Sequence, residues 1–167
     1  MRFSLATIIA ASAVLAAPSN MADTKTLATR GNTHVVTVKD ELFSPTSLEA
    51  GVGDTVRFEF GVGFQSVVEA DFETPCYPKS GGFASGKFIT PPSDIKNSEV
   101  YEIDITNEDP IWLYNGMNGN CHKKSAVFVI NSHNVQGRSY SDFAFKSVNA
   151  RTTKNAKQNR GRVVSRD

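Results

Sequence analysis

The side chains of this 167-residue chain that are best suited to metal or redox chemistry gather in one short segment. Met117, Cys121 and His122 lie in a stretch rich in glycine and asparagine, between two apolar runs, Ile111–Tyr114 and Ala126–Ile130. Thioether, thiolate and imidazole groups are the ligands that copper and similar soft ions prefer. The flanking runs are aromatic and β-branched, which favours strands. The sequence therefore predicts a compact loop between two strands, a suitable place for a metal site.

The redox state of the cysteines depends on where the protein resides. Residues 1–17 are typical of a secretory signal peptide, because Arg2 is followed by a short apolar run and then by small residues. We therefore expect a secreted, extracellular protein. In an oxidising compartment the only two cysteines, Cys76 and Cys121, would form a disulfide, worth roughly 4 kcal/mol on the chain-entropy model. The alternative is a thiolate that binds metal or acts as a nucleophile.

Other residues that could support catalysis or anchoring form no convincing arrangement. Glu69, Asp71 and Glu73 alternate, which predicts the wet face of one strand rather than a pair of catalytic acids. Ser85 has no general base assignable near it. No later segment is long and apolar enough to cross a membrane, and no hydrophobic tail for a GPI anchor follows. We expect a protein that is not an enzyme and has no membrane anchor.

The elements that would position the loop are strands. Residues 34–39 are rich in β-branched side chains, and residues 54–60 and 99–106 alternate between apolar and polar types. Such alternation indicates antiparallel sheets with one face in water. Frequent glycine, proline and asparagine residues mark the turns between them. The sequence predicts one all-β sandwich or barrel domain over residues 34–133, preceded by a flexible lead-in at residues 18–33.

Charge is distributed unevenly along the chain. Residues 18–145 carry ten basic and sixteen acidic residues, whereas residues 146–167 carry seven basic and one acidic. The near-neutral total therefore conceals an acidic body and a basic tail. We interpret residues 134–167 as a polar, basic and mostly disordered tail, in which 139–148 could form a short strand or helix. No aromatic residue is interleaved with the basic ones after Arg151, so nucleic acid is not an expected partner.

An ordered set of short motifs resembles a known family. The motifs are Gly53-Asp54-Thr55-Val56-Arg57-Phe58, Phe64-Gln65-Ser66-Val67, Phe72-Glu73-Thr74-Pro75-Cys76, Gly81-Gly82-Phe83-Ala84-Ser85-Gly86, Pro110-Ile111-Trp112-Leu113-Tyr114, Cys121 and Phe128-Val129-Ile130-Asn131. In this order and spacing the chain is similar to the plastocyanin-like cupredoxin domain of fungal extracellular serine-rich proteins over roughly residues 34–133. This resemblance implies a cupredoxin-like Greek-key β-sandwich and a Cys76–Cys121 disulfide.

The resemblance also implies where copper ligands would stand. Copper-binding members of the family resemble blue-copper proteins, which use two histidines, a cysteinate and a weak axial methionine. The matching positions here are Gln65, Asn115, Asn120 and Ala126, or Ser125 if the alignment shifts by one residue. None is a blue-copper ligand, which predicts that the blue-copper centre is absent and that no cofactor is bound. His122 and Met117 could form at most a loose copper site.

These expectations lead to a hypothesis about function. The resemblance implies a fungal protein. From its small size, the predicted secretion and the loss of the copper ligands, we expect a secreted protein that binds, non-enzymatically, at the cell wall or a host surface, as a virulence effector. The alternative is a copper-binding or electron-transfer cupredoxin. Five residues are predicted to line a shallow polar and aromatic binding site: Gln65, Trp112, Tyr114, Asn115 and Asn120. We expect a monomer whose partner is an unidentified wall or host protein or glycan.

Overall fold

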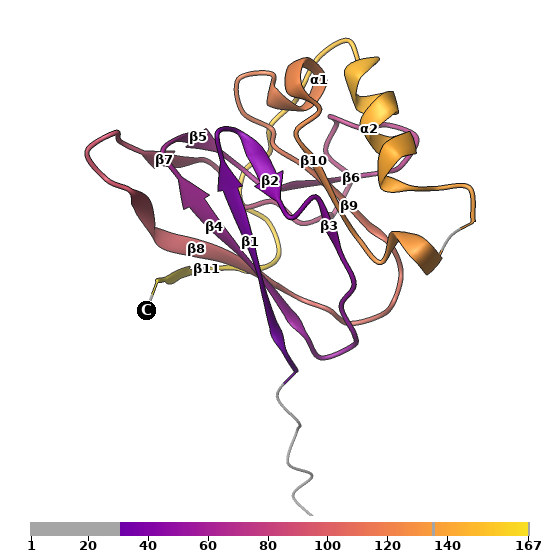
Figure 1. Ribbon diagram of the computed structural model, residues 1–167, viewed down its shortest axis with the longest axis horizontal. Helices are drawn as coiled ribbons and strands as arrows, with labels where there is room; N and C mark the ends of the chain where they lie inside the picture. Colours follow the sequence, from indigo (N-terminus) through magenta and orange to yellow (C-terminus); the bar gives the residue numbers. More distant parts are fainter. Residues whose placement is uncertain (1–30, 135, 167) are drawn as a thin grey trace, which may run out of the picture.

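The computed structural model describes residues 31–134 and 136–166 (Figure 1). The predicted signal peptide and most of the predicted lead-in lie outside these residues. Within the described residues, no helix is long and apolar enough to span a bilayer. Most of the ordered chain is β-strand, arranged as two main sheets packed face to face, which confirms the predicted all-β sandwich.

The larger sheet has five strands and contains the two segments with the clearest alternation. Val56, Phe58 and Phe60 are fully buried, whereas Arg57 and Glu59 on the opposite face are partly exposed. Such alternation requires one face on the core and one in water. All neighbours are antiparallel except β1 and β4, which are parallel. In spatial order the strands are β11 (Arg162–Ser165), β8 (Lys96–Asp104), β4 (Thr55–Gly61), β1 (Thr33–Lys39) and β2 (Leu42–Ser44).

The second sheet has four strands, and two of them are the apolar runs that flank the predicted loop. Its order is β3 (Ser47–Leu48), β10 (Val127–Ile130), β9 (Ile111–Tyr114) and β6 (Val68–Ala70). A two-stranded sheet, β5 (Gly63–Gln65) and β7 (Phe88–Thr90), closes one end of the sandwich. The short helix α1 (Asn120–Lys124) follows the loop after β9, and a 3-10 turn, η1 (Ser132–Asn134), follows β10.

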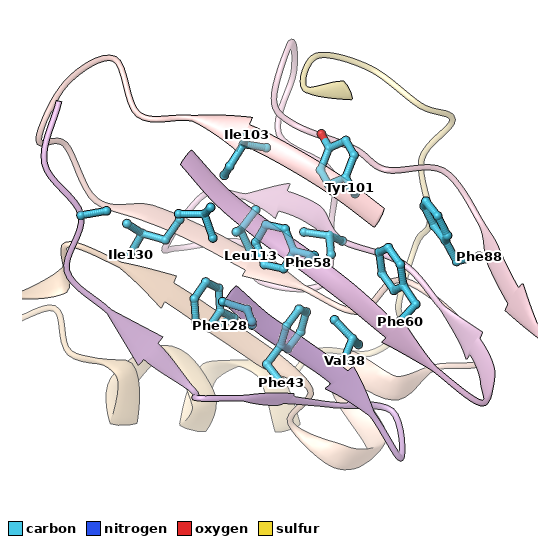
Figure 2. Close-up of a cluster of buried hydrophobic side chains, with 14 of the residues drawn as sticks. Val38, Phe43, Phe58, Phe60, Phe88, Tyr101, Ile103, Leu113, Phe128 and Ile130 are labelled. Atoms are coloured by element: carbon cyan, nitrogen blue, oxygen red, sulfur yellow. The ribbon is translucent and has the colours of Figure 1, made fainter. Parts of the chain in front are cut away.

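Aromatic rings fill the space between the two sheets (Figure 2). Phe128 of β10 stacks on Phe43 of β2 with ring centroids 5.6 Å apart, and it meets Phe58 of β4 edge-on at 5.7 Å. Burying such rings supplies most of the apolar surface that stabilises a domain of this size. The fully or nearly fully buried members of this core include Val36, Val38, Phe60, Tyr101, Ile103, Leu113 and Ile130.

A second apolar core lies on the outer face of the four-stranded sheet. Trp112 of β9 projects there and contacts Phe72 at 4.7 Å and Phe143 at 5.1 Å between ring centroids. Phe143 belongs to helix α2 (Tyr140–Val148), which Figure 1 shows lying against this sheet. Ser139 starts the helix with a reciprocal capping box to Asp142. The helix therefore covers a face that a two-layer sandwich would leave in water.

The prediction of a disordered basic tail is wrong for the described residues. After α2 the chain crosses the loop that follows β9, and residues 162–165 then pair with β8 as strand β11. The acidic body supplies the partners: Arg162 pairs with Glu102 and Asp104, and Lys146 with Glu73. Fixed partners of opposite charge and backbone hydrogen bonds replace the solvation that the composition suggested.

Candidate functional site

The predicted disulfide is confirmed and holds the loop that follows β9. Cys76 and Cys121 are bonded, with their Cα atoms 5.5 Å apart, and both are fully buried. Cys121 lies in the first turn of α1, directly after Asn120. The cystine therefore joins α1 to the segment after β6 and excludes a free thiolate as a metal ligand.

Asn115, the first residue after β9, is the centre of a buried hydrogen-bond cluster. Its Oδ1 accepts from the backbone N–H of Ser66 at 3.2 Å and of Met117 at 3.1 Å. Its Nδ2 donates to Oε1 of Gln65 at 2.7 Å and to the carbonyl of Glu41 at 3.1 Å. An asparagine amide has two donors and one carbonyl oxygen with two lone pairs, so every bonding position of Asn115 is used.

Gln65 completes the cluster on β5. Its Nε2 donates to the carbonyl of Val62 at 3.2 Å, and its side chain, like that of Asn115, is fully buried. The hydroxyl of Ser66 accepts from the N–H of Gly116 at 2.9 Å. These bonds join β5 and the residue after it to the loop after β9.

The four positions matched to copper ligands are neighbours in the structure. Gln65 and Asn115 are bonded through their side chains, and the N–H of Asn115 donates to the carbonyl of Ala126 at 2.9 Å. The N–H of Ala126 in turn donates to the carbonyl of Asn120 at 3.2 Å. Asn120 is nearly fully buried, and its Nδ2 has no hydrogen-bond partner among the described residues.

These residues do not fit a blue-copper ion. Neutral amides and an alanine methyl offer no thiolate, imidazole or thioether, and the side-chain oxygens of Gln65 and Asn115 already accept N–H groups. Within the described residues, no group of three His, Cys, Asp or Glu side chains is placed to hold a metal.

The two leftover soft ligands are engaged by the C-terminal segment. Sδ of Met117 accepts from Nδ2 of Asn155 at 3.1 Å, and Nδ1 of His122 lies 2.7 Å from the hydroxyl of Thr153. A Cβ atom on Gly116 would lie only 2.7 Å from the side chain of Asn155, so the segment packs directly on the loop. Sequence reasoning missed Thr153 and Asn155, because nothing in a polar tail indicates which loop it will contact.

The structure corrects the expectation of a shallow polar and aromatic site. Trp112 and Tyr114 face the second core, away from Gln65 and Asn115, because alternate residues of β9 point to opposite faces. Tyr114 is fully buried, its hydroxyl donates to the carbonyl of Lys154 at 2.7 Å, and burial raises its pKa. Asn120 is equally inaccessible. The five residues therefore do not form an open site.

The residues considered for catalysis have structural roles. Glu69 is buried rather than on a wet face; it pairs with Lys79 at 2.7 Å and accepts from the N–H of Phe83. The hydroxyl of Ser85 accepts from the N–H of Val67 at 2.9 Å and donates to the carbonyl of Gly86. These contacts do not place Glu69 or Ser85 beside a general base or a nucleophile.

Comparison with known proteins finds partial similarity to proteins named as cupredoxins. No family model matches the chain. It is 33% identical over 89 residues, which is 53% of this chain, to probable GPI-anchored cupredoxin-1 of the fungus Arthroderma benhamiae. That match covers 44% of the fungal protein, so the chain spans less than half the length of this curated relative. A solved structure, a novel purple cupredoxin from Nitrosopumilus maritimus, aligns with a TM-score of 0.40 and 15% identity over 58% of this chain and 96% of that one.

Proposed function

We propose that the protein is a secreted, non-enzymatic binding protein built on a cupredoxin-like sandwich whose copper centre has been replaced by an amide cluster. It acts at the cell wall or at a host surface, as a virulence effector. The observation that carries the proposal is the saturated bonding of Asn115, at the position matched to the copper thiolate. A ligand position with no lone pair to spare cannot take up a metal without breaking the cluster.

The extracellular location rests on three agreeing features. The N-terminal sequence is typical of a signal peptide. The two cysteines form a buried disulfide, which persists in oxidising compartments. The fungal relative is named as GPI-anchored, which places that protein at a cell surface.

The second candidate function is copper binding or electron transfer. It is favoured by the similarity to a protein named as a cupredoxin. The donor set opposes it, because copper would have to be held by amides or by Met117 and His122, which already contact Asn155 and Thr153. Amides are poor ligands for either oxidation state that a blue-copper protein cycles between.

Copper titration of the purified full chain separates the two candidates. We expect no intense visible band on addition of Cu(II), and no copper retained after dialysis. A matched variant, M117L/H122Q, identifies any loosely held copper that depends on those two side chains. Stoichiometric copper that survives dialysis, with an intense blue or purple band in the unaltered chain, would overturn the proposal.

Binding at the wall is tested by co-sedimentation with insoluble cell-wall polysaccharide and with host surface material. The folded chain is expected in the pellet, and the chain reduced and unfolded in denaturant, then diluted, provides the control for non-specific adhesion. If the folded chain stays in the supernatant with both materials, the binding role is contradicted, whatever the outcome of the copper titration.

A further inference from the structure

A groove with a volume of about 410 Å³ lies beside helix α2 and shares no residue with the amide cluster. Residues 73–77 form one wall, and the last turn of α2 with the two residues after it forms the other. Ligand pockets in proteins have volumes of roughly 300–1,000 Å³. The groove is therefore large enough for a small organic ligand or for a short part of a polymer.

Both walls of the groove are held by the body of the protein. Pro75 is buried, and the next residue, Cys76, forms the disulfide with Cys121. The carbonyl of Cys76 also accepts from the N–H of Lys154 at 2.9 Å. Helix α2 is anchored by the buried ring of Phe143, which packs against the second core. Because the walls are fixed before a ligand arrives, binding costs less free energy of ordering.

Each wall contributes one solvent-exposed aromatic ring to the groove. Tyr77 is 39% exposed and Phe145 is 71% exposed. The face of an aromatic ring carries partial negative charge, so it attracts C–H groups that neighbouring oxygen atoms have polarised. A pyranose ring with equatorial hydroxyls presents such C–H groups on both of its faces. The two aromatic rings are therefore suited to contact sugar units.

The charges in the groove are paired with each other. Among the described residues that line it, only Glu73 and Lys146 carry a charge, and Nζ of Lys146 lies 2.7 Å from Oε2 of Glu73. The other carboxylate oxygen of Glu73 lies 3.8 Å from Nη2 of Arg138. A paired carboxylate and ammonium attract neither an acidic nor a basic ligand strongly. The groove therefore favours a neutral ligand.

Two neutral polar side chains at the groove can bond sugar hydroxyls. Nδ2 of Asn149 donates to the carbonyl of Phe145 at 2.7 Å, which positions the amide. A side-chain amide has a second N–H and a carbonyl oxygen, so Asn149 can still donate to one hydroxyl and accept from another. The exposed Thr74 adds a hydroxyl of its own on the opposite wall.

We propose that this groove binds a neutral glycan built of pyranose rings with equatorial hydroxyls, with Tyr77 and Phe145 contacting the sugar faces and Asn149 bonding their hydroxyls. The alternative occupant, an extended peptide, would need an unpaired strand edge to bond its backbone. Residues 73–77 and 145–150 contain no strand, so the groove offers no such edge. The inference rests on the proposed binding function and names the ligand class for it.

Nuclear magnetic resonance titration of the isotope-labelled full chain tests the proposal. The neutral ligands are cellohexaose, laminarihexaose and chitohexaose; hexagalacturonate is the acidic comparison, and N-acetyltryptophanamide represents an apolar peptide side chain. We expect at least one neutral hexamer to shift the amide signals of residues 73–77 and 145–150 and to saturate with a dissociation constant below about 1 mM. Hexagalacturonate and N-acetyltryptophanamide should leave these signals unchanged.

Three variants test the aromatic contacts. F145A and Y77A should each bind the neutral hexamer about tenfold more weakly, because each loses one ring that contacts the sugar. Y77F keeps the ring and should bind as the unaltered chain does. The matched control is F64A, which removes a ring that is 45% exposed on β5, outside the groove, and should leave the affinity unchanged.

The proposal is overturned if no neutral hexamer shifts the groove signals, if hexagalacturonate or N-acetyltryptophanamide binds there as tightly, or if F64A loses as much affinity as F145A. Co-sedimentation separates this failure from that of the proposed function. A chain that pellets with wall material but binds no hexamer uses another surface for binding. A chain that binds a hexamer in the groove but pellets with neither material keeps the groove and loses the proposed role at the wall or host surface.

Discussion

The outer faces of the two main sheets of the sandwich differ in their exposure to solvent. In the five-stranded sheet, β4 alternates between fully buried residues such as Phe58 and partly exposed ones such as Arg57. In the four-stranded sheet, all four residues of β10 are buried, and Trp112 and Tyr114 of β9 are buried on the face opposite to Leu113. One sheet has a wet face, and the other is covered by α2 and the segment after it.

The difference shows that the two sequence patterns predict different surroundings for a strand. An alternating run predicts one face in water, and a continuous apolar run predicts that both faces are covered. A strand that is apolar throughout must be covered on both faces. The runs Ile111–Tyr114 and Ala126–Ile130 thus already indicate that some other part of the chain packs outside them. Phe143, in the mainly polar C-terminal segment, supplies the contact.

Replacing Phe143 with alanine tests the covered face and should have the largest effect. The ring is fully buried against Phe72 and Trp112, so its loss should lower the free energy of unfolding by about 4 kcal/mol. Phe145 is on the same helix but 71% exposed, and F145A should cost less than about 0.5 kcal/mol. Guanidinium denaturation followed by the fluorescence of Trp112 measures both. Equal losses in the two variants would mean that α2 does not cover the sheet as described.

Replacing Asn115 with alanine tests the link between the two sheets. Four hydrogen bonds are lost and buried partners such as Oε1 of Gln65 are left unpaired, so we expect a loss of about 3 kcal/mol. Asn120 is equally buried, but its Nδ2 has no partner among the described residues, and N120A should cost about 1 kcal/mol or less. The same denaturation experiment compares them, and a larger loss in N120A would contradict the role of Asn115 as the centre of the cluster.

Replacing Arg162 with glutamine tests the outer face of the five-stranded sheet and should have the smallest effect, about 0.5 kcal/mol at neutral pH. Its pair with Asp104 is exposed, and exposed ion pairs contribute little, whereas the buried carboxylate of Glu102 keeps its pair with Arg57. Arg162 bonds Asp104 and holds the pKa of that carboxyl below its usual value. A lowered pKa in the folded state stabilises above the unfolded value near 4 and is lost as the pH falls through the folded value.

The difference in stability between the unaltered chain and R162Q should therefore shrink between pH 7 and pH 3. Urea denaturation at the two pH values measures it, and R151Q, which removes an exposed arginine with no recorded partner in the described residues, is the control. A difference that is the same at both pH values would show that the pair with Asp104 does not contribute.

Local patterns predicted much of the sandwich and little of the C-terminal part. The alternating segments 54–60 and 99–106 overlap β4 and β8, and the disulfide was expected from the cysteine count together with the predicted signal peptide. The ordered tail could not be predicted from its composition, because its partners are the acidic residues of strands far away in sequence. The sequence shows charge complementarity between an acidic body and a basic tail, but composition alone does not distinguish a tail that pairs with the body from one that stays solvated.

For the candidate site as well, the sequence predicted some features and not others. The motif spacing identified Gln65, Asn115, Asn120 and Ala126, which the structure places next to one another. It could not indicate that Trp112 and Tyr114 face away from them, since that depends on which face of β9 each residue occupies.

The pairing of β11 with β8 has a consequence for how the protein is made. Strand β8 is complete once residue 104 has been synthesised, but the strand that covers its edge is residues 162–165. The nascent chain must therefore carry an unpaired strand edge for most of the synthesis of its second half, and such edges recruit other chains.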